Sequence, residues 1–266
     1  MLGARAAAGF PPLALGLAAL AWAILLAWDA SPYGRYLNHG DWTTLGLGAA
    51  ICAALPGGPW LVGASVYAGG WVTMSAAMML PTALPLIRAF DRMIAARPAR
   101  TRLHLLLIGG YLLAWAGFGL AAHALDLVLH ATLAGWGFLA RHPEAAGAAV
   151  LALAGGFQFS ALKYRCLDAC RAPLGFVVRH WRAAHPARAA LRLGLAHGAY
   201  CVGCCWALML LMFVVGTGNL GWMFALGLLM AVEKNHPWGR HLARPLGAGL
   251  LALAGLIALR ALSGGG

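Results

Sequence analysis

The chain has 266 residues, of which 62% are hydrophobic and only 10% are charged, and its mean hydropathy is +0.78. A soluble domain usually carries about a quarter charged residues, so this composition excludes an ordinary soluble protein. The formal net charge of +12 does not indicate a nucleic-acid partner, because the arginines are confined to short segments between apolar runs. We expect an all-α fold, a polytopic transmembrane helix bundle that forms a single domain over residues 1–266 in a lipid bilayer.

Apolar runs long enough to cross a membrane recur along the whole chain. In lipid every backbone group must be satisfied within its own segment, so helices of about 20 apolar residues are the expected spans. The seven predicted spans are residues 10–28, 60–87, 103–122, 145–163, 193–215, 219–233 and 246–262. The first lacks a small-residue cleavage pattern, which favours a retained span over a signal peptide. Residues 43–56 are apolar but too short to cross, and they predict a re-entrant or interfacial helix.

The basic residues are distributed unequally between the predicted loops. Of the 19 Lys and Arg residues, all but Arg35, Arg141 and Arg260 lie before the first predicted span or after the second, fourth and sixth. Because cytoplasmic loops carry the excess of Lys and Arg, this bias predicts a cytoplasmic amino terminus and a carboxyl terminus on the opposite side. The alternation also agrees with a count of about seven spans.

Five of the six cysteines lie in two short stretches, "CLDACR" and "YCVGCCW". Both stretches are predicted near the cytoplasmic face. A spacing of four residues places side chains on one stripe of a helix. The first predicted stripe is Cys166 and Cys170; the second is His197, Cys201 and Cys205, with Cys204 beside it. An antiparallel helix pair could bring the two stripes together, whereas the remaining cysteine, Cys52, is expected to pack as a small apolar residue.

Converging thiolates favour a soft or borderline metal, Cu(I) first and Zn(II) second. His197 could complete or replace one ligand, although a hydrogen-bonded helix histidine is the alternative. Thioethers select Cu(I), so Met209 joins the candidate metal ligands, and Met74 and Met78 are additional candidates. Simple packing is the alternative interpretation of these methionines, since methionine is an ordinary gap filler.

Ionisable and amide side chains flank the inner ends of the fourth and sixth predicted spans, where they are costly unless paired or in water. Gln158, Lys163, Arg171 and Glu233 are therefore candidates for a shell around the metal ligands. Lys163 and Lys234 are expected to snorkel to the membrane surface, which needs no functional explanation. Glu233 lacks that option and needs a partner.

A second candidate site lies on the opposite face of the membrane. His123, Asp126 and His130 are three and four residues apart, which places them on one side of a helix. They could capture a metal outside, while ordinary polarity at the membrane interface is the alternative.

Three stretches together resemble an uncharacterised bacterial family of predicted metal-binding integral membrane proteins. They are "WVTMSAAMMLP", "FQFSALKYRCLDACRAP" and "HGAYCVGCCWALMLLMF" with the following "GNLGWMFAL" and Glu233-Lys234. The family pattern of an aromatic residue and Gln, then Pro-Leu-Lys, then Cys-x3-Cys-Arg-x-Pro, maps onto residues 157–173. This chain departs from the family at two positions. Ala161 replaces the proline of Pro-Leu-Lys, and Gly218, in the later stretch before Asn219, stands where a methionine is expected. The resemblance implies a metal-binding protein of the bacterial inner membrane, and the charge bias then predicts that its carboxyl terminus is in the periplasm.

Three functions stay open from the sequence. The first is handling, insertion or transport of a soft metal by the cysteine cluster. The second is a thiol–disulfide oxidoreductase coupled to a quinone, because Cys201-x2-Cys204 has the spacing of a redox dithiol. The third is a non-catalytic subunit that scaffolds a membrane or periplasmic partner protein through its small-residue helix faces. No phosphate-binding glycine loop follows a strand, so no nucleotide is expected, and whether the protein is an enzyme stays open.

Overall fold

The computed structural model describes residues 11–31, 60–133, 144–215 and 219–263. All regular secondary structure in these ranges is helical, which confirms the predicted fold class. The helices are α1 (Pro11–Asp29), α3 (Trp60–Met79), η2 (Pro81–Ala83), α4 (Leu84–Met93), α5 (Arg100–Leu133), α7 (Glu144–Phe157), α8 (Ala161–Arg171), α9 (Pro173–His180), α10 (Pro186–Val215), α11 (Leu220–Asn235), η3 (Gly239–Leu242) and α12 (Ala243–Ser263). The predicted helix at 43–56 lies outside the described residues.

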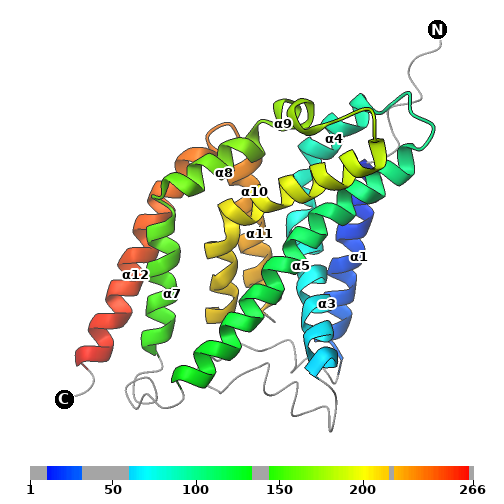
Figure 1. The fold of residues 1–266 in the computed structure, drawn as a ribbon. Helices are drawn as coiled ribbons and strands as arrows, with labels where there is room; N and C mark the ends of the chain where they lie inside the picture. Colours follow the sequence, from blue (N-terminus) through cyan, green and yellow to red (C-terminus); the bar gives the residue numbers. More distant parts are fainter. Residues whose placement is uncertain (1–10, 32–59, 134–143, 216–218, 264–266) are drawn as a thin grey trace.

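The long helices run between two ends of an elongated bundle (Figure 1). At one end α4, α8 and α9 lie across the tops of the long helices, and α1 begins at this same end. The last helix, α12, finishes at the opposite end, so the described chain starts and stops on different sides of the bundle (Figure 1). This arrangement agrees with an odd number of passes.

Two of the predicted spans are bent rather than straight. The segment 60–87 is divided at Pro81, where α3 and the following helix meet at 48°, because proline lacks the N–H that a continuous helix needs. The segment 145–163 is divided between Phe157 and Ala161, where α7 and α8 meet at 63°. Ser160 caps the new helix by accepting a hydrogen bond from the Lys163 backbone N–H at 3.1 Å. The second bend moves Cys166 and Cys170 onto α8, away from the axis of α7.

Four described helices are long and apolar enough to cross a membrane: Pro12–Asp29, Arg100–Leu125, Pro186–Met212 and Gly239–Arg260. The number rises to six if each bent pair counts as one span. The remaining predicted span corresponds to α11, which has only 16 residues. The described part of the chain therefore contains four to six candidate spans by length and composition, and a seventh stays a prediction.

The outer helices expose apolar side chains. Most of the apolar segment around α12 is not buried by the rest of the protein, and Leu253, Leu256 and Leu259 on this helix are 46–66% exposed. Large exposed apolar surfaces mark membrane or protein contacts rather than contact with water. The faces of α12 are thus compatible with lipid.

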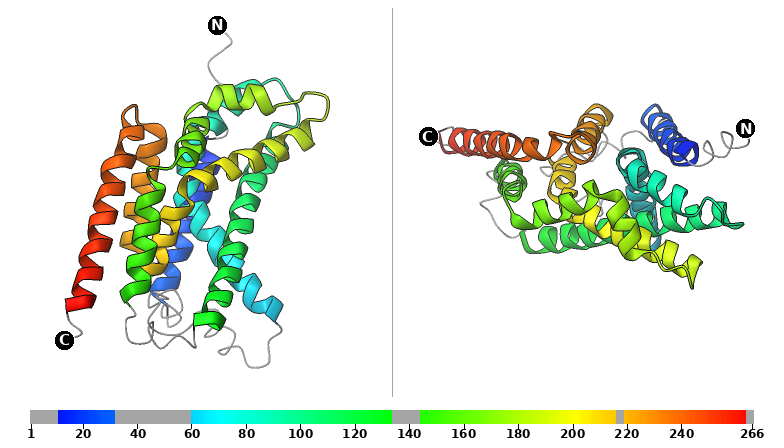
Figure 2. Two further views of the ribbon diagram at one scale, coloured as in Figure 1. Left: turned by 60° about the vertical axis from the view of Figure 1, so that its left-hand side comes forward. Right: turned by 90° about the horizontal axis from the view of Figure 1, so that it is seen from above.

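Glycines allow the closest helix contacts of the bundle. A side chain at Gly194 of α10 would collide with the backbone of Leu107 on α5, and one at Gly110 of α5 would collide with the backbone of Leu191. Small residues at such positions let two backbones approach, as in membrane helix pairs. The α5–α10 pair is the most extensive contact of the fold, and α7 pairs similarly with α12 (Figures 1 and 2). Helix α10 is thereby held centrally, with α8 and α11 also against it.

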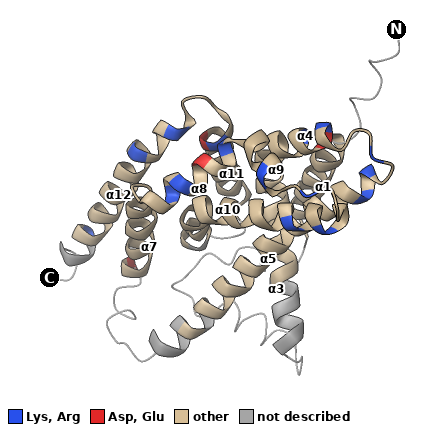
Figure 3. Ribbon diagram, turned by 45° about the horizontal axis from the view of Figure 1, so that its top comes forward, with Lys and Arg blue, Asp and Glu red and all other residues tan. Residues whose placement is uncertain are grey.

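The charged residues gather at the end that carries α4, α8 and α9 (Figure 3). Among the described residues, every Lys and Arg except Arg260 lies in these helices, in their connections, in the first two turns of α5, α10 or α12, or at η3 and the end of α11. Asp91 of α4 fixes one connection by accepting hydrogen bonds from Arg100 of α5 at 2.9 and 2.5 Å. We call this side of the bundle the basic end.

Candidate metal centre

The described cysteines meet where α8 packs on α10, close to the basic end. Cys170 of α8 interacts with Cys204 of α10, and the Cys204 and Cys205 sulfurs are 3.3 Å apart. The side chain of Cys201 in turn interacts with Cys204 and Cys205. All five described cysteines are free thiols and all are buried. Four of the five are therefore neighbours where two helices meet, and we call these four the sulfur group; within it the Cys204 and Cys205 sulfurs are in direct contact.

Cys166 lies at the edge of this group. Its Sγ packs directly on Gly203 of α10, where an added Cβ would come within 2.7 Å of the sulfur. The absence of a side chain at Gly203 is what lets α8 approach α10 so closely at this level. A larger residue there would separate Cys166 and Cys170 from α10.

The sulfur of Cys201 faces a buried lysine. Lys234 Nζ, at the end of α11, donates to Cys201 Sγ at 2.8 Å and to Thr82 Oγ1 at 3.2 Å, and it lies 3.8 Å from Met79 Sδ. Tyr111 of α5 completes the surroundings, because its hydroxyl is 3.0 Å from Cys201 Sγ and donates to the Met79 carbonyl at 3.2 Å. Lys234 and Tyr111 thus contact the Cys201 thiol directly, and Thr82 and Met79 contact it through Lys234. The nearest group to the thiol is therefore a buried ammonium.

A second buried lysine, Lys163, lies in the first turn of α8. Lys163 Nζ donates to Glu233 Oε2 at 2.7 Å, and both side chains have 0% exposure. Glu233 Oε1 and Gln158 Oε1 are buried without a hydrogen-bond partner among the described residues. Neither Lys163 nor Lys234 snorkels, because each has a buried partner; the expectation that they reach for the membrane surface is wrong.

Arg171 joins α8 to the end of α11. Its Nη1 donates to the carbonyls of Glu233 at 2.6 Å and His236 at 2.8 Å, and its Nη2 donates to the Pro237 carbonyl at 2.9 Å. A guanidinium with several donors is well suited to the free carbonyls at a helix carboxyl terminus. Arg171 therefore fixes the position of the Glu233-Lys234 pair relative to the cysteines of α8.

His197 lies one turn before Cys201 on α10 and is 3% exposed. Its ring stacks on Tyr111 with centroids 5.9 Å apart and meets the edge of Phe176 of α9 at 5.2 Å. Its Nδ1 is buried with no hydrogen-bond partner among the described residues. An imidazole nitrogen in that position is open to a ligand.

The predicted methionine ligands are all buried: Met209 is 0% exposed, Met78 is 3% and Met74 is 5%. Met209 is on α10, two turns beyond Cys201, whereas Met74 and Met78 are on α3. Met209 lies farther from the basic end than Cys201, because α10 runs away from that end (Figure 1). Met78 directly precedes Met79, whose Sδ is 3.8 Å from Lys234 Nζ.

The outer candidate site is only partly described. His123 is in the lower part of α5 and is 8% exposed. The side chains of Asp126 and His130 lie outside the described residues. The helix places the three backbone positions on one side of α5, as their spacing predicts.

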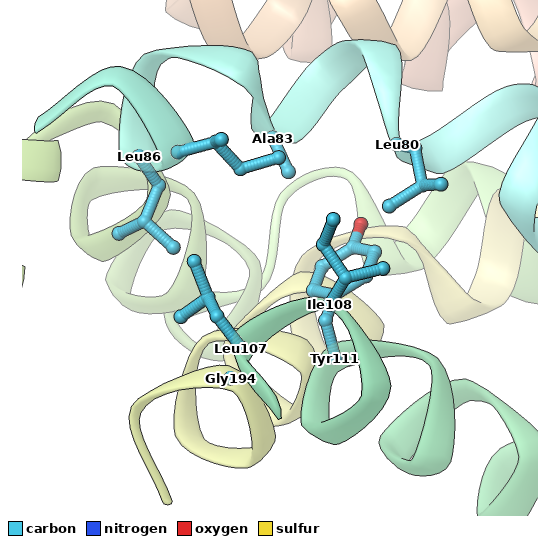
Figure 4. Close-up of a pocket in the computed structure, with 8 residues that line it drawn as sticks. Leu80, Ala83, Leu86, Leu107, Ile108, Tyr111 and Gly194 are labelled. Atoms are coloured by element: carbon cyan, nitrogen blue, oxygen red, sulfur yellow. The ribbon is translucent and has the colours of Figure 1, made fainter. Parts of the chain in front are cut away.

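A small apolar pocket adjoins the tyrosine. It is lined by Leu80, Leu86, Leu107, Ile108 and Tyr111, together with neighbouring small residues, between α5 and the η2–α4 segment (Figure 4). Its wall is almost entirely hydrocarbon, so it offers no ligand for a metal ion. The pocket therefore stands apart from the thiols, with Tyr111 between them.

In the part of the chain that the structure describes, no three or more His, Cys, Asp or Glu side chains are arranged to hold a metal ion. The sulfur group is thus a set of neighbouring thiols and not a closed, preformed coordination site. Its composition is nevertheless that of a soft-metal site, because thiolate and thioether ligands select Cu(I).

The sequence of the central region decides the family. Residues 68–257 match the family model PpoB2, described as a copper chaperone. The chain belongs to the copper chaperone family. The matched region contains every helix that contributes a sulfur or a buried lysine to the candidate centre. No characterised protein and no solved structure matches the chain.

Two residues of the candidate centre, Tyr111 and Thr82, were missed by sequence reasoning. Tyr111 and Thr82 contact the Cys201–Lys234 pair, and Met79 lies beside it. Met79 belongs to the methionine-rich motif "WVTMSAAMMLP" that the sequence already associates with copper, and it ends α3 two residues before Pro81. Nothing in the spacing of Tyr111 or Thr82 pointed to the cysteines.

Proposed function

We propose that the protein is an integral protein of the bacterial inner membrane and binds Cu(I) through its cysteine thiolates near the cytoplasmic face. The observation that carries the proposal is the sulfur group at the contact of α8 with α10, where Cys166 Sγ lies against Gly203 and the Cys204 and Cys205 sulfurs are 3.3 Å apart. Sulfur ligands favour Cu(I) over harder cations, and the family is one of copper chaperones. Cu(I) is satisfied by as few as two soft ligands, so a pair of thiolates is enough.

The apolar helices and the charge distribution support the proposed membrane position. Four to six described segments can cross a bilayer, and the basic end matches the Lys and Arg excess of cytoplasmic loops. The cysteine group then lies beneath the cytosolic leaflet, where reduced thiols persist. Copper taken up there is held for insertion into, or transport to, a partner protein.

The binding test is copper loading of detergent-purified protein. The wild-type protein is expected to bind Cu(I) in a stoichiometric amount. Cys170→Ser/Cys204→Ser is expected to lower the Cu(I) affinity at least tenfold, because it removes one thiolate from each helix. Cys52→Ser is the matched control and should bind like the wild type. Competition with a coloured Cu(I) chelator measures all three affinities.

Equal affinity of the double variant and the wild type would contradict the assignment of these thiolates. If neither the wild type nor either variant binds copper, the proposed function itself is contradicted.

A quinone-coupled thiol–disulfide oxidoreductase is the alternative with a specific observation behind it, the close contact of Cys204 with neighbouring thiols. In that reaction two thiols lose two electrons and two protons to the quinone, and a disulfide and a quinol form. The pair with the redox spacing is Cys201 and Cys204, and Cys204 Sγ donates to the Cys201 carbonyl at 3.2 Å. Cys204 and Cys205, whose sulfurs are in contact, are adjacent in a helix, so their Cα atoms lie about 3.8 Å apart, which is shorter than disulfides usually span. Burial of both thiols also denies access to a protein substrate. A disulfide that cycles on addition of quinone, found without bound copper, would favour this alternative.

A further inference from the structure

Sulfur-containing side chains line one face of α10, from the candidate centre toward the far end of the bundle. Cys201, Cys205, Met209 and Met212 follow one another at spacings of four, four and three residues, which keeps them on a single stripe. With a rise of about 1.5 Å per residue, the stripe extends roughly 16 Å along the helix. These four side chains are at most 1% exposed. We call them, with the methionines described next, the sulfur track.

Contacts at Cys201 show which helices the stripe faces. Cys201 Sγ is 2.8 Å from Lys234 Nζ of α11, and the same nitrogen is 3.8 Å from Met79 Sδ of α3. At the Cys201 end the stripe therefore faces α11 directly and α3 through Lys234. Nearer the middle of the bundle Gly227 of α11 lies against the Cβ of Met78, so α3 and α11 stay in contact below this level.

The remaining buried methionines are on α11, which contacts α10, and on α3, which contacts α11. Met74, Met78 and Met79 are on α3, and Met223 and Met230 are on α11, two turns apart. Because α3 and α11 run toward the basic end and α10 runs away from it (Figure 1), earlier residues of α3 and α11 lie level with later residues of α10. Seven of the nine methionines of the chain are thus at most 5% exposed on three neighbouring helices.

We propose that the sulfur track carries Cu(I) from the cysteine group across the membrane toward the far end, which makes the protein a translocating chaperone. This inference rests on the proposed function, because the track begins at the thiolates that load it. Copper stays Cu(I) throughout; at each step one Cu–S bond forms as another breaks, without oxidation or reduction. Successive positions on α10 are about 4.5 to 6 Å apart along the axis, and flexible thioether side chains bridge that separation.

Burial supports this mode of transfer over flow through water. The side chains of the track are dry, so a hydrated ion would lose its water without compensation. An ion that exchanges water for sulfur avoids this loss, which makes the track selective for soft monovalent ions such as Cu(I) and excludes Na⁺ and Mg²⁺.

The test uses full-length protein in liposomes that contain a Cu(I)-specific fluorescent chelator, with Cu(I) and a reductant supplied outside. Met212→Leu/Met223→Leu removes a thioether from each of two helices at the end of the track far from the cysteines. Leucine conserves volume, so the fold should be retained. We expect the transfer rate to fall at least tenfold while the Cu(I) affinity in detergent stays that of the wild type.

Met93→Leu is the matched control, because Met93 is on α4 and outside the track; it should transfer copper at the wild-type rate. A double variant that transfers copper as fast as the wild type overturns the track. So does a wild-type protein that binds Cu(I) in detergent but moves none into the liposomes, a result that leaves the proposed binding function intact. A wild-type protein that binds no Cu(I) refutes the proposed function instead.

Discussion

Glu233→Gln alone is expected to lower the free energy of unfolding by about 3–5 kcal/mol, the usual cost of breaking a buried ion pair. Lys163 and Glu233 are both fully buried and 2.7 Å apart, so the substitution leaves a buried ammonium without its carboxylate. The measurement is chemical or thermal unfolding in detergent. Replacing both partners, as Lys163→Met/Glu233→Leu, should recover most of the loss, since no charge is then left unpaired.

Asp168→Asn is the matched control for this prediction. It also removes a carboxylate from an ion pair, that with Arg240 at 2.8 Å, but both side chains are about half exposed. An exposed pair contributes at most about 1 kcal/mol. If Glu233→Gln is as mild as Asp168→Asn, the buried pair does not hold α8 against α11.

Lys234→Met is expected to weaken Cu(I) binding by about 10- to 100-fold. Two thiolates and one Cu(I) carry a net negative charge, and the Lys234 ammonium beside Cys201 balances it in a dry interior. A hydrogen bond to a charged group is worth about 1.5–3 kcal/mol, which corresponds to that range of affinity. Chelator competition measures the change, and Lys234→Arg should retain a larger part of the affinity because it keeps the charge.

The control for the loss of one positive charge is Arg179→Met. Arg179 is exposed on α9 at the same end of the molecule, so water already screens its charge and copper affinity should be unchanged. Tighter copper binding by Lys234→Met would contradict charge balance and would make Lys234 a competitor of the metal.

The helices could be predicted from the sequence because an apolar run long enough to cross a membrane has few alternatives to a helical conformation. The bend at Pro81 fell at a residue that breaks helices, near the predicted end of its span. The bend before Ala161 was missed, since Gln158-Phe159-Ser160 contains no proline and only the cap at Ser160 restarts the helix. The 16 residues of α11 show how an apolar run can predict a span and still fall short of the usual length.

The candidate centre was predicted only where it depends on spacing within one helix. Cysteine stripes follow from the helical repeat, but the side chains that approach Cys201 come from distant segments. Tyr111 reaches it because α5 and α10 cross closely at Gly110 and Gly194, and that crossing depends on both helices at once. The lysines were assigned to the membrane surface because a lone cation usually snorkels, whereas here each finds a buried partner that the sequence does not place beside it.

The most direct test of the account is X-ray absorption at the copper edge of the purified, Cu(I)-loaded protein. A Cu(I) ion whose nearest neighbours are sulfur atoms, lost or replaced by lighter atoms in Cys170→Ser/Cys204→Ser, is the predicted result. Copper surrounded by nitrogen or oxygen alone, with a spectrum that the substitution leaves unchanged, would contradict it.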